Sequence, residues 1–487
     1  MRYQNIRTGH FISRPNRFIA KIEIDGSEEI VHVKNTGRCA ELLVPGAEVY
    51  VQDSQPDLSL PGTTEAEKEQ RKKSESNRKT RWDLIGVKKG DRLINMDSQV
   101  PNKIVKEWLE HGNLIEGITK IQPEYTYGNS RIDLYVEAGN RKILIEVKGV
   151  TLEEDGVVRF PDAPSGRAVK HVHELQKALQ DGYECYIFFV VQMSDVRYFT
   201  PNTDTQPEFA EALQEAEEAG VHVVAYDCLV EEDTIQIQKE VPVILEDPEL
   251  YELSQRLVPW YQKERRDLPW RHTTDPYRIW VSEIMLQQTR VEAVKRYYAR
   301  FMEVLPDVKS LAEVEEDKLL KLWEGLGYYN RVRNMQKAAR QIMVDYNGTF
   351  PQTYEEIRSL TGIGNYTAGA ISSFSYGLAY PAVDGNVLRV ITRITADDSD
   401  IMKQSTRKKI EEKLQRVIPV GHAGDFNQGL IELGAIVCVP NGDPKCEECP
   451  AATFCKAKLQ GKIQELPVKE KAKARRIEKK TVLILRD

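Results

Sequence analysis

Four of the seven cysteines lie close together near the end of the chain, at Cys438, Cys446, Cys449 and Cys455. Disulfides are rare in cytosolic proteins, where clustered cysteines more often bind metal. Four thiolates in so short a span can enclose a [4Fe–4S] cluster or a zinc ion. The spacing therefore predicts a metal centre, and unligated structural cysteines are the alternative.

Two glycines, Gly362 and Gly364, separate two helical stretches, the second beginning near Asn365. Gly-x-Gly suits a tight hairpin, and the N–H groups at the positive end of the second helix can bind a DNA phosphate. A glycine turn between two core helices is the alternative. Asp384, 20 residues beyond Gly364, begins a further helix, where an aspartate is commonly an N-cap.

A third group of residues lies in the N-terminal half. Asp133 is on one predicted strand, and Glu146 and Lys148 are on the next. Two carboxylates on adjacent strands can hold Mg²⁺, and the lysine can orient a water or stabilise a phosphate. Glu124 would add a third carboxylate. Surface strands often contain such residues, so the spacing predicts a candidate Mg²⁺ site without establishing a nuclease.

The elements that carry these residues divide the chain into four parts. Residues 1–85 predict short β-strands, and 86–245 alternate strands with helices, which indicates an α/β layer. Residues 246–467 are helical throughout, and 468–487 form a basic tail. The polar segment 53–79 has no periodicity and predicts a mobile insertion or a long loop.

Composition excludes a membrane-spanning or secreted protein. The chain has 487 residues, 41% of them hydrophobic and 29% charged, which is ordinary for a soluble protein of two or three domains. No apolar run approaches the roughly 20 residues that cross a bilayer, and the N-terminus lacks a signal sequence. We therefore expect a cytoplasmic, nucleoid-associated location and no membrane partner. The net charge of −7 argues only weakly against DNA binding, because a basic face can coexist with an acidic total.

Longer blocks join the C-terminal motifs in order. They are Leu268-Pro269-Trp270-Arg271, Trp280-Val281-Ser282-Glu283-Ile284-Met285-Leu286-Gln287-Gln288-Thr289, Gly325-Leu326-Gly327-Tyr328-Tyr329 and Ile431-Glu432-Leu433-Gly434-Ala435. From about Leu257 to Pro467 the chain resembles MutY-type adenine DNA glycosylases of the helix-hairpin-helix/Gly-Pro-Asp superfamily. The resemblance implies an all-α domain with an iron–sulfur loop and a [4Fe–4S] cluster on the four cysteines. The first cysteine gap has seven residues, where the family has six.

The resemblance also assigns site residues. It implies Glu283, Asp384, Asn386 and Tyr366 as the catalytic group. Substrate-binding residues would be Arg271 and Glu432 around a flipped base, Gln288 and Tyr328 entering the base stack, and Gly362 and Gly364 at the DNA backbone. Ordinary packing is the alternative role for the pair that enters the stack.

The implied chemistry needs two carboxylates in opposite protonation states. A base inside a duplex must be flipped out before it can react. Glu283, its pKa raised by burial, would protonate a ring nitrogen of adenine, while ionised Asp384 would stabilise the oxocarbenium-like sugar. Tyr366 occupies the place of the lysine with which relatives resembling endonuclease III attack the sugar, so a Schiff base is not expected.

The expected partner is double-stranded DNA that contains A:G or A:8-oxoguanine mispairs, bound by a monomer. Family members usually continue into a second domain that reads 8-oxoguanine. Only 20 residues follow Pro467, and we therefore expect weak discrimination between 8-oxoguanine and guanine.

The N-terminal half resembles the SfsA (sugar fermentation stimulation) family. The matching stretches are Asn35-Thr36-Gly37-Arg38, Pro101-Asn102-Lys103, Ser130-Arg131-Ile132-Asp133, Glu146 to Leu152, Phe160-Pro161-Asp162-Ala163 and Lys170-His171-Val172-His173-Glu174-Leu175. The resemblance implies an OB-like β domain followed by a PD-(D/E)xK nuclease-like domain, in a family generally associated with DNA binding. Gln206 stands where the family often has Asp.

The leading hypothesis is therefore a monofunctional adenine glycosylase joined to an SfsA-like DNA-binding module. Two alternatives stay open. One is a DNA-binding or regulatory protein whose glycosylase half is inactive. The other is a metal-dependent nuclease that uses the helical half for docking to DNA.

Overall fold

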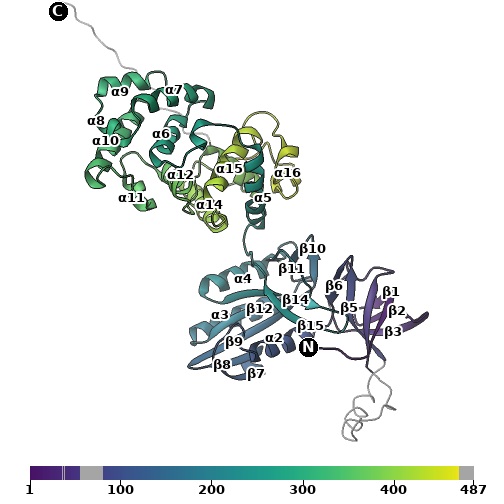
Figure 1. The fold of residues 1–487 in the computed structure, drawn as a ribbon. Coiled ribbons are helices and arrows are strands. Elements are labelled where there is room, and N and C mark those ends of the chain that lie inside the picture. Colours follow the sequence, from purple (N-terminus) through teal and green to yellow (C-terminus); the bar gives the residue numbers. More distant parts are fainter. Residues whose placement is uncertain (36, 38, 55–79, 471–487) are drawn as a thin grey trace, which may run out of the picture. The chain divides into compact units, whose positions relative to one another are not determined.

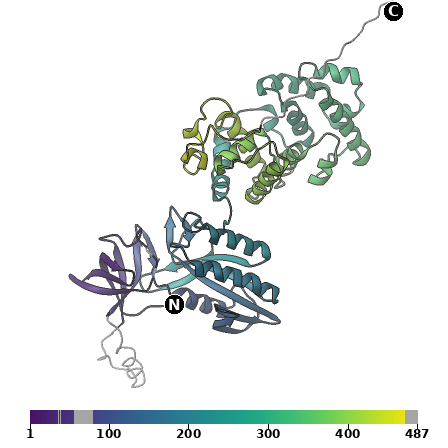
Figure 2. The ribbon, with the colours of Figure 1, turned by 180° about the vertical axis from the view of Figure 1, so that it is seen from behind.

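The computed structural model describes residues 1–35, 37, 39–54 and 80–470, and the chain divides into two compact units, Met1–Glu246 and Asp247–Asp487 (Figures 1 and 2). Most of the polar segment 53–79 and of the basic tail 468–487 lies outside the described residues. The predictions for these two segments are therefore untested.

Six strands form a small barrel at the start of the first unit. Their order is β3-β2-β1-β4-β5-β6, and a parallel pairing of β3 with β5 closes the sheet on itself. Alternate residues are buried, as Ala20, Ile22 and Ile24 of β2 show. The strands are β1 (Ile6–Asn16), β2 (Ile19–Ile24), β3 (Ser27–Val33), β4 (Glu48–Asp53), β5 (Trp82–Lys89) and β6 (Arg92–Asn95). This closure confirms the predicted OB-like β domain.

The rest of the first unit is an α/β layer around a six-stranded sheet of order β15-β14-β12-β9-β8-β7. Three central strands run parallel, and the outer ones are antiparallel. The sheet contains β7 (Ile118–Tyr127), β8 (Ser130–Ala138), β9 (Arg141–Val150), β12 (Glu184–Val191), β14 (His222–Val230) and β15 (Ile235–Glu240). A smaller sheet contains β10 (Leu152–Glu154), β11 (Val157–Phe160) and β13 (Tyr198–Pro201). The predicted α/β layer is confirmed.

Helices cover both faces of the large sheet (Figure 1). Leu144 and Val150 of β9 share one apolar core with α3 (Gly166–Gln180) and α4 (Pro207–Ala219). Ile143 and Ile145 share another with α2 (Val100–Glu110). Since side chains alternate along a strand, Glu146 and Lys148 lie on the face that α3 and α4 cover.

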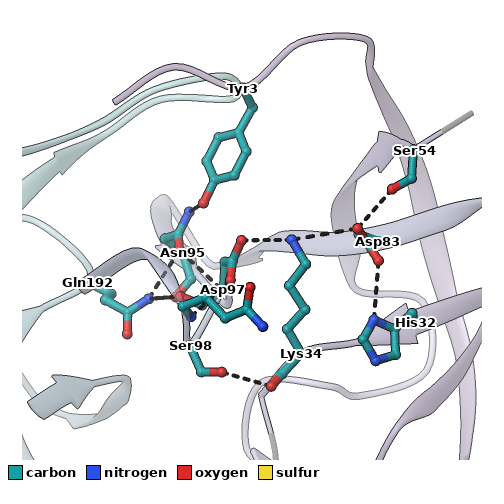
Figure 3. Close-up of polar contacts among 10 residues, drawn as sticks. Tyr3, His32, Lys34, Ser54, Asp83, Asn95, Asp97, Ser98 and Gln192 are labelled. Atoms are coloured by element: carbon teal, nitrogen blue, oxygen red, sulfur yellow. Dashed lines mark hydrogen bonds and ion pairs between the residues drawn. The ribbon is translucent and has the colours of Figure 1, made fainter. Parts of the chain in front are cut away.

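A buried polar network joins the barrel to the α/β layer (Figure 3). The Lys34 ammonium lies 2.9 Å from Asp97 Oδ2 and 3.5 Å from Asp83 Oδ2, and both aspartates are 2% exposed. The Asn95 amide donates to the Tyr3 hydroxyl at 2.9 Å, and the Gln192 amide donates to Asn95 Oδ1 at 3.0 Å. One lysine therefore supports two carboxylates that have little access to water.

The second unit is helical throughout and has two apolar cores. Residues between Leu268 and Ile371 form the first core, and residues from Leu250–Val258 and Val383–Ala451 form the second. The elements are α5 (Pro248–Glu264), η1 (Pro269–Arg271), α6 (Pro276–Leu286), α7 (Val291–Val304), α8 (Val308–Glu313), α9 (Glu316–Trp323), α10 (Asn330–Asp345), α11 (Tyr354–Ser359), α12 (Asn365–Tyr376), α13 (Gly385–Thr395), α14 (Gln404–Val417), α15 (Ala423–Ile436), η2 (Cys446–Glu448) and α16 (Lys456–Leu459). The predicted all-α domain is confirmed. Among the described helices, none combines the length and apolar character needed to span a membrane.

The lysine in the polar network generates a stability prediction. In Lys34→Met, two buried carboxylates lose their shared cation, and we expect the first unit to lose about 3–5 kcal/mol of stability. Hydrogen exchange of the β3 and β5 amides in the full chain measures this loss. Lys21→Met is the matched control, because the Lys21–Glu28 pair is exposed and its loss should cost under about 1 kcal/mol. An equally small loss in Lys34→Met would contradict the proposed support.

Candidate functional site

Helix α6 brings a carboxyl group into the core of the helical unit. Asp275 caps the helix by accepting from the N–H groups of Tyr277 and Arg278. Glu283 lies in the buried part of α6 and is only 6% exposed. Burial raises the pKa of Glu283 to about 7, the charge of Asp384 adds to the rise, and a hydrogen bond from Tyr366 opposes it. Glu283 therefore holds its proton up to neutral pH.

A glycine hairpin between α11 and α12 positions Tyr366. Gly362 has a φ of +82°, and a Cβ there would lie 2.8 Å from Asn334 Cβ, so only glycine fits. Gly364 is the N-cap of α12, and Tyr366 follows in the first turn. The Tyr366 hydroxyl donates to Glu283 Oε2 at 2.5 Å. The predicted hairpin is present, and it places a phenol against the buried carboxyl group.

Asp384 is the N-cap of α13. Its Oδ1 accepts from the backbone N–H groups of Asn386 and Val387, each at 2.8 Å, and its Oδ2 accepts from the Asn386 side-chain amide at 2.7 Å. Burial raises the pKa of Asp384, and these three hydrogen bonds oppose the rise. Arg389 orients the Asn386 amide by donating to its oxygen at 2.9 Å. The capping geometry therefore supplies three hydrogen bonds that favour the charged form of Asp384, whereas Glu283 has one such bond, from Tyr366.

Glu283, Tyr366, Asp384 and Asn386 line one cavity of about 610 Å³, within the usual size range of ligand sites. Arg271 lines it as well, together with Trp270. The four predicted catalytic residues are thus brought together at a cavity lined by residues of both apolar cores.

Glu432 is fully buried, and it supports Arg271 without lining the cavity itself. Arg266 and Arg271 reach its Oε2 at 2.7 and 2.8 Å. Burial opposes ionisation, but the bonds from Arg266 and Arg271 outweigh it and lower the pKa of Glu432 to about 2. Both oxygens of Glu432 accept from arginines, and its expected role around the base stays a prediction. The sequence offers no spacing signal for Arg266.

Gln288 and Tyr328 lie on two loops that meet at a second cavity of about 310 Å³. Both have positive φ angles, +59° and +49°, which is uncommon outside glycine. Tyr328 is 66% exposed. Their exposure makes ordinary core packing a poor explanation for these two side chains.

The four clustered cysteines surround a common apolar pocket with Val390, Ile394 and Leu433. The additional residue in the first gap is accommodated by a closed loop, because the Lys445 N–H donates to the Val437 carbonyl at 3.0 Å. Burial raises the pKa of Cys449 to about 12, and the three neighbouring sulfurs add to the rise. Such thiols need a positively charged group before they can ionise together, so the chemistry of the donor set fits a metal centre. Among the described residues, however, no three of these sulfurs are arranged as ligands of a single ion.

The N-terminal carboxylates occupy adjacent strands, as predicted. Asp133 accepts from Asn102 at 2.8 Å and from the Val147 N–H at 2.9 Å. Glu146 Oε1 contacts both Lys148 and His171, while Glu146 Oε2 is buried without a hydrogen-bond partner in the described part of the chain. Burial opposes ionisation of Glu146, but His171 and Lys148 outweigh it and lower its pKa.

Glu124 does not join this group. Its φ is +55°, which interrupts the alternation of β7, and its exposed side chain pairs with Arg131 at 3.4 Å. The expectation of a third carboxylate there is therefore corrected. Gln206 also has a local role, because its Oε1 accepts from the Ser165 N–H at the start of α3. Across the described residues, no three His, Cys, Asp or Glu side chains are arranged as ligands of a single metal ion.

Comparison with known families covers both halves of the chain. Residues 12–96 match the SfsA N-terminal OB domain, and residues 99–234 match the sugar fermentation stimulation protein RE domain. Residues 281–419 match the HhH-GPD superfamily base excision DNA repair protein.

Similar proteins agree with this division. Sugar fermentation stimulation protein homologs from Clostridium beijerinckii and Desulfitobacterium hafniense are 54% and 56% identical over 245 residues, which is 50% of this chain and 100% and 99% of theirs. The solved structure of Pyrococcus furiosus SfsA in complex with Ca²⁺ is 28% identical, with a TM-score of 0.44 and coverage of 50% of this chain and 98% of that one. A thermostable thymine-DNA glycosylase is 30% identical, with a TM-score of 0.40 and coverage of 44% and 98%.

The chain therefore belongs to the SfsA family over its N-terminal half and carries in its C-terminal half a base-excision DNA repair domain of the HhH-GPD superfamily.

Proposed function

We propose that the C-terminal half hydrolyses the N-glycosidic bond of adenine mispaired with guanine or 8-oxoguanine in double-stranded DNA. The observation that carries this proposal is the pair of carboxyl groups on one cavity, Glu283 with its pKa raised to about 7 and Asp384 bound by three N–H groups. Bond cleavage needs a proton for the departing base and negative charge near the sugar. This pair supplies both.

Glu283 acts as the general acid. Adenine is a poor leaving group as an anion, so a proton transferred to a ring nitrogen lowers the barrier to its departure. The proton is available because burial keeps Glu283 neutral near pH 7. Tyr366 holds one carboxyl oxygen through its hydroxyl group, which leaves the other oxygen to carry the proton toward the base.

Asp384 stabilises the positive charge that develops on the sugar. Its three N–H donors hold the carboxylate in one orientation before the substrate binds, so little reorganisation is needed during the reaction. Water then adds to the sugar and completes the hydrolysis. Tyr366 lies in the place of a possible amine nucleophile, and no lysine is among the described residues that line the cavity, which supports hydrolysis without a Schiff base.

We also propose that Cys438, Cys446, Cys449 and Cys455 hold a [4Fe–4S] cluster. The support is their common pocket and the raised thiol pKa values, which a cationic centre would reverse. When bound, such a cluster would cross-link the segment from α15 to α16. Arg393 would remain beside it, since its guanidinium donates to Cys438 Sγ at 3.4 Å.

A second candidate function concerns the SfsA-like half. We propose a divalent cation site at Asp133 and Glu146, supported by the buried and unpartnered Glu146 Oε2. A cation there would satisfy that oxygen, and Lys148 could stabilise a bound phosphate, as metal-dependent phosphodiester hydrolysis requires.

Substitution of either carboxyl group tests the glycosylase. We expect Glu283→Gln and Asp384→Asn to slow single-turnover adenine release from an A:8-oxoguanine duplex by roughly 10²–10⁴-fold, with DNA affinity largely retained. The product strand should stay intact until alkali is added. Glu316→Gln is the control, because its side chain is 55% exposed on α9 and does not line the cavity. Near wild-type release of adenine by Glu283→Gln would contradict the assignment of Glu283 as the general acid.

The pH dependence identifies the acid independently. Since Glu283 must be protonated and its pKa is raised to about 7, the wild-type rate should fall about tenfold per pH unit above that pH, on the alkaline side of a bell-shaped profile. Asp384 must be ionised, and its raised pKa should lower the rate at acidic pH. The alkaline decline should disappear in Glu283→Gln; if it persists, another group is the acid.

Iron analysis tests the cysteine centre. Anaerobically purified full chain should be brown and contain about four irons. Cys449→Ser should lose most of this iron, while Cys228→Ser, at a buried cysteine of the other unit, should retain it. Stoichiometric zinc, or no metal in the wild type, would contradict the proposal.

Calorimetric titration tests the N-terminal cation site. The wild type should bind Mg²⁺ or Ca²⁺ at this position, and Glu146→Gln should lose that binding. Glu124→Gln should bind like the wild type, because Glu124 is exposed and outside the group. Unchanged binding in Glu146→Gln would exclude this location.

A further inference from the structure

One arginine, Arg331 in the first turn of α10, ties together the two loops that carry Gln288 and Tyr328. Its Nη1 donates to the carbonyls of Ile284 at 2.9 Å and Gln287 at 2.5 Å, at the end of α6. Its Nη2 donates to the carbonyls of Leu326 at 2.9 Å and Gly327 at 3.3 Å, in the loop before α10. A single planar guanidinium thus bonds to both segments at once.

The setting of this guanidinium is unusual for a cation. In the described residues it has no carboxylate within ion-pair distance, and its Nε is buried without a partner. Its remaining contacts are with rings, since the guanidinium carbon lies 5.6 Å from the Trp323 ring centre and 5.5 Å from that of Tyr328. Burial lowers the pKa of Arg331. This half-buried charge is supported by carbonyls and rings alone, and the four carbonyls need the fork of donors that a guanidinium provides.

The residues that this arginine holds are strained and exposed. Gln288 and Tyr328 have φ angles of +59° and +49°, and such conformations cost of order 1–3 kcal/mol each outside glycine. They persist only where the surroundings determine them. Arg331 bonds to the residue before Gln288 and to the residue before Tyr328, the two peptide groups that set these conformations.

We propose that Arg331 is a positioning residue for base flipping. It holds Gln288 and Tyr328 in the conformations from which their side chains enter the base stack when the target base leaves it. This role rests on the proposed function, and it concerns base flipping and not bond cleavage. Arg331 does not line the cavity that contains Glu283 and Asp384. Among the described residues, it bonds to that part of the molecule only through the backbone carbonyls of Ile284 and Gln287, so the comparison of duplex and single-stranded substrate must separate delivery of the base from a displaced acid.

Paired substrates separate the two steps. We expect Arg331→Met and Arg331→Lys to lower single-turnover release of adenine from an A:G duplex by about 10- to 100-fold, as a misplacement of about 1 Å can do. A lysine retains the charge but cannot bond to four carbonyls in one plane. The loss should shrink to within about threefold of wild type when adenine lies in a single strand, where no stacked base must be displaced. Arg333→Gln is the control, because Arg333 is exposed on the same helix and pairs with Glu316 at 2.7 Å.

A fluorescent base gives a readout that does not depend on adenine release. With 2-aminopurine in place of the target adenine, binding of the wild type should raise the fluorescence as the base unstacks, and both Arg331 variants should show little of this rise at saturating protein. If the wild type releases no adenine but still raises the fluorescence, the proposed function fails and the role of Arg331 stands. Equal losses on the duplex and on the single strand, or wild-type fluorescence in both variants, overturn the proposal for Arg331. Circular dichroism melting at wild-type temperature establishes that the variants are folded.

Discussion

The helical unit depends on one costly placement, the burial of the Glu283 carboxyl group beside the charge of Asp384. Transfer of an ionised carboxylate out of water costs several kcal/mol, so burial favours the protonated form. Helix α6 enforces this by burying Glu283 along with its helix neighbours Ile279, Trp280 and Ile284. The charge of Arg271 favours ionisation of Glu283, but burial outweighs it. Glu432 holds Arg271 in place by accepting from its guanidinium.

The second carboxyl group, Asp384, is also buried and burial raises its pKa, but hydrogen bonds oppose this rise at three points. Unlike Glu283, it lies at the positive end of a helix and accepts two backbone N–H groups and an amide. Hydrogen bonds to the charged form oppose the desolvation. Glu283 lies within a helix, whereas Asp384 lies at the cap of one. This difference in backbone position separates the proposed roles of the two groups.

Much of this arrangement could be predicted from the sequence, and the failures have local causes. The alternation of strands and helices predicted for residues 86–245 is present, as in α4, which begins at Pro207 and ends before Gly220 in a left-handed conformation. Glu283 and Asp384 could be predicted because each belongs to one of the sequence motifs that follow one another along the C-terminal half. Glu124 was assigned wrongly because a single positive φ turns its side chain out of the strand alternation, and no neighbouring residue signals this.

The sequence does not predict the residues that hold the site residues in place from other parts of the fold. Two of these supports reach far along the chain: His171 contacts Glu146, 25 positions away, and Arg266 contacts Glu432, 166 positions away. Arg331 instead donates to backbone carbonyls. No pattern of side chains along the sequence predicts such contacts. The position of Glu432 could be anticipated, but not that arginines occupy both of its oxygens. Sequence spacing identifies groups that share one local element, and it says little about the side chains that hold such groups from elsewhere in the fold.

The two apolar cores of the helical unit have a consequence for how such a site can diverge. The acid and its tyrosine belong to segments of one core, and the capped aspartate begins a helix of the other. A substitution that repacks the first core can alter the proton affinity of Glu283 while the hydrogen bonds to Asp384 stay the same. On the proposed function, protonation of the base and stabilisation of the sugar can therefore be altered separately. The pH at which Glu283 ionises can then shift through repacking of the first core alone, without exchange of either carboxyl group.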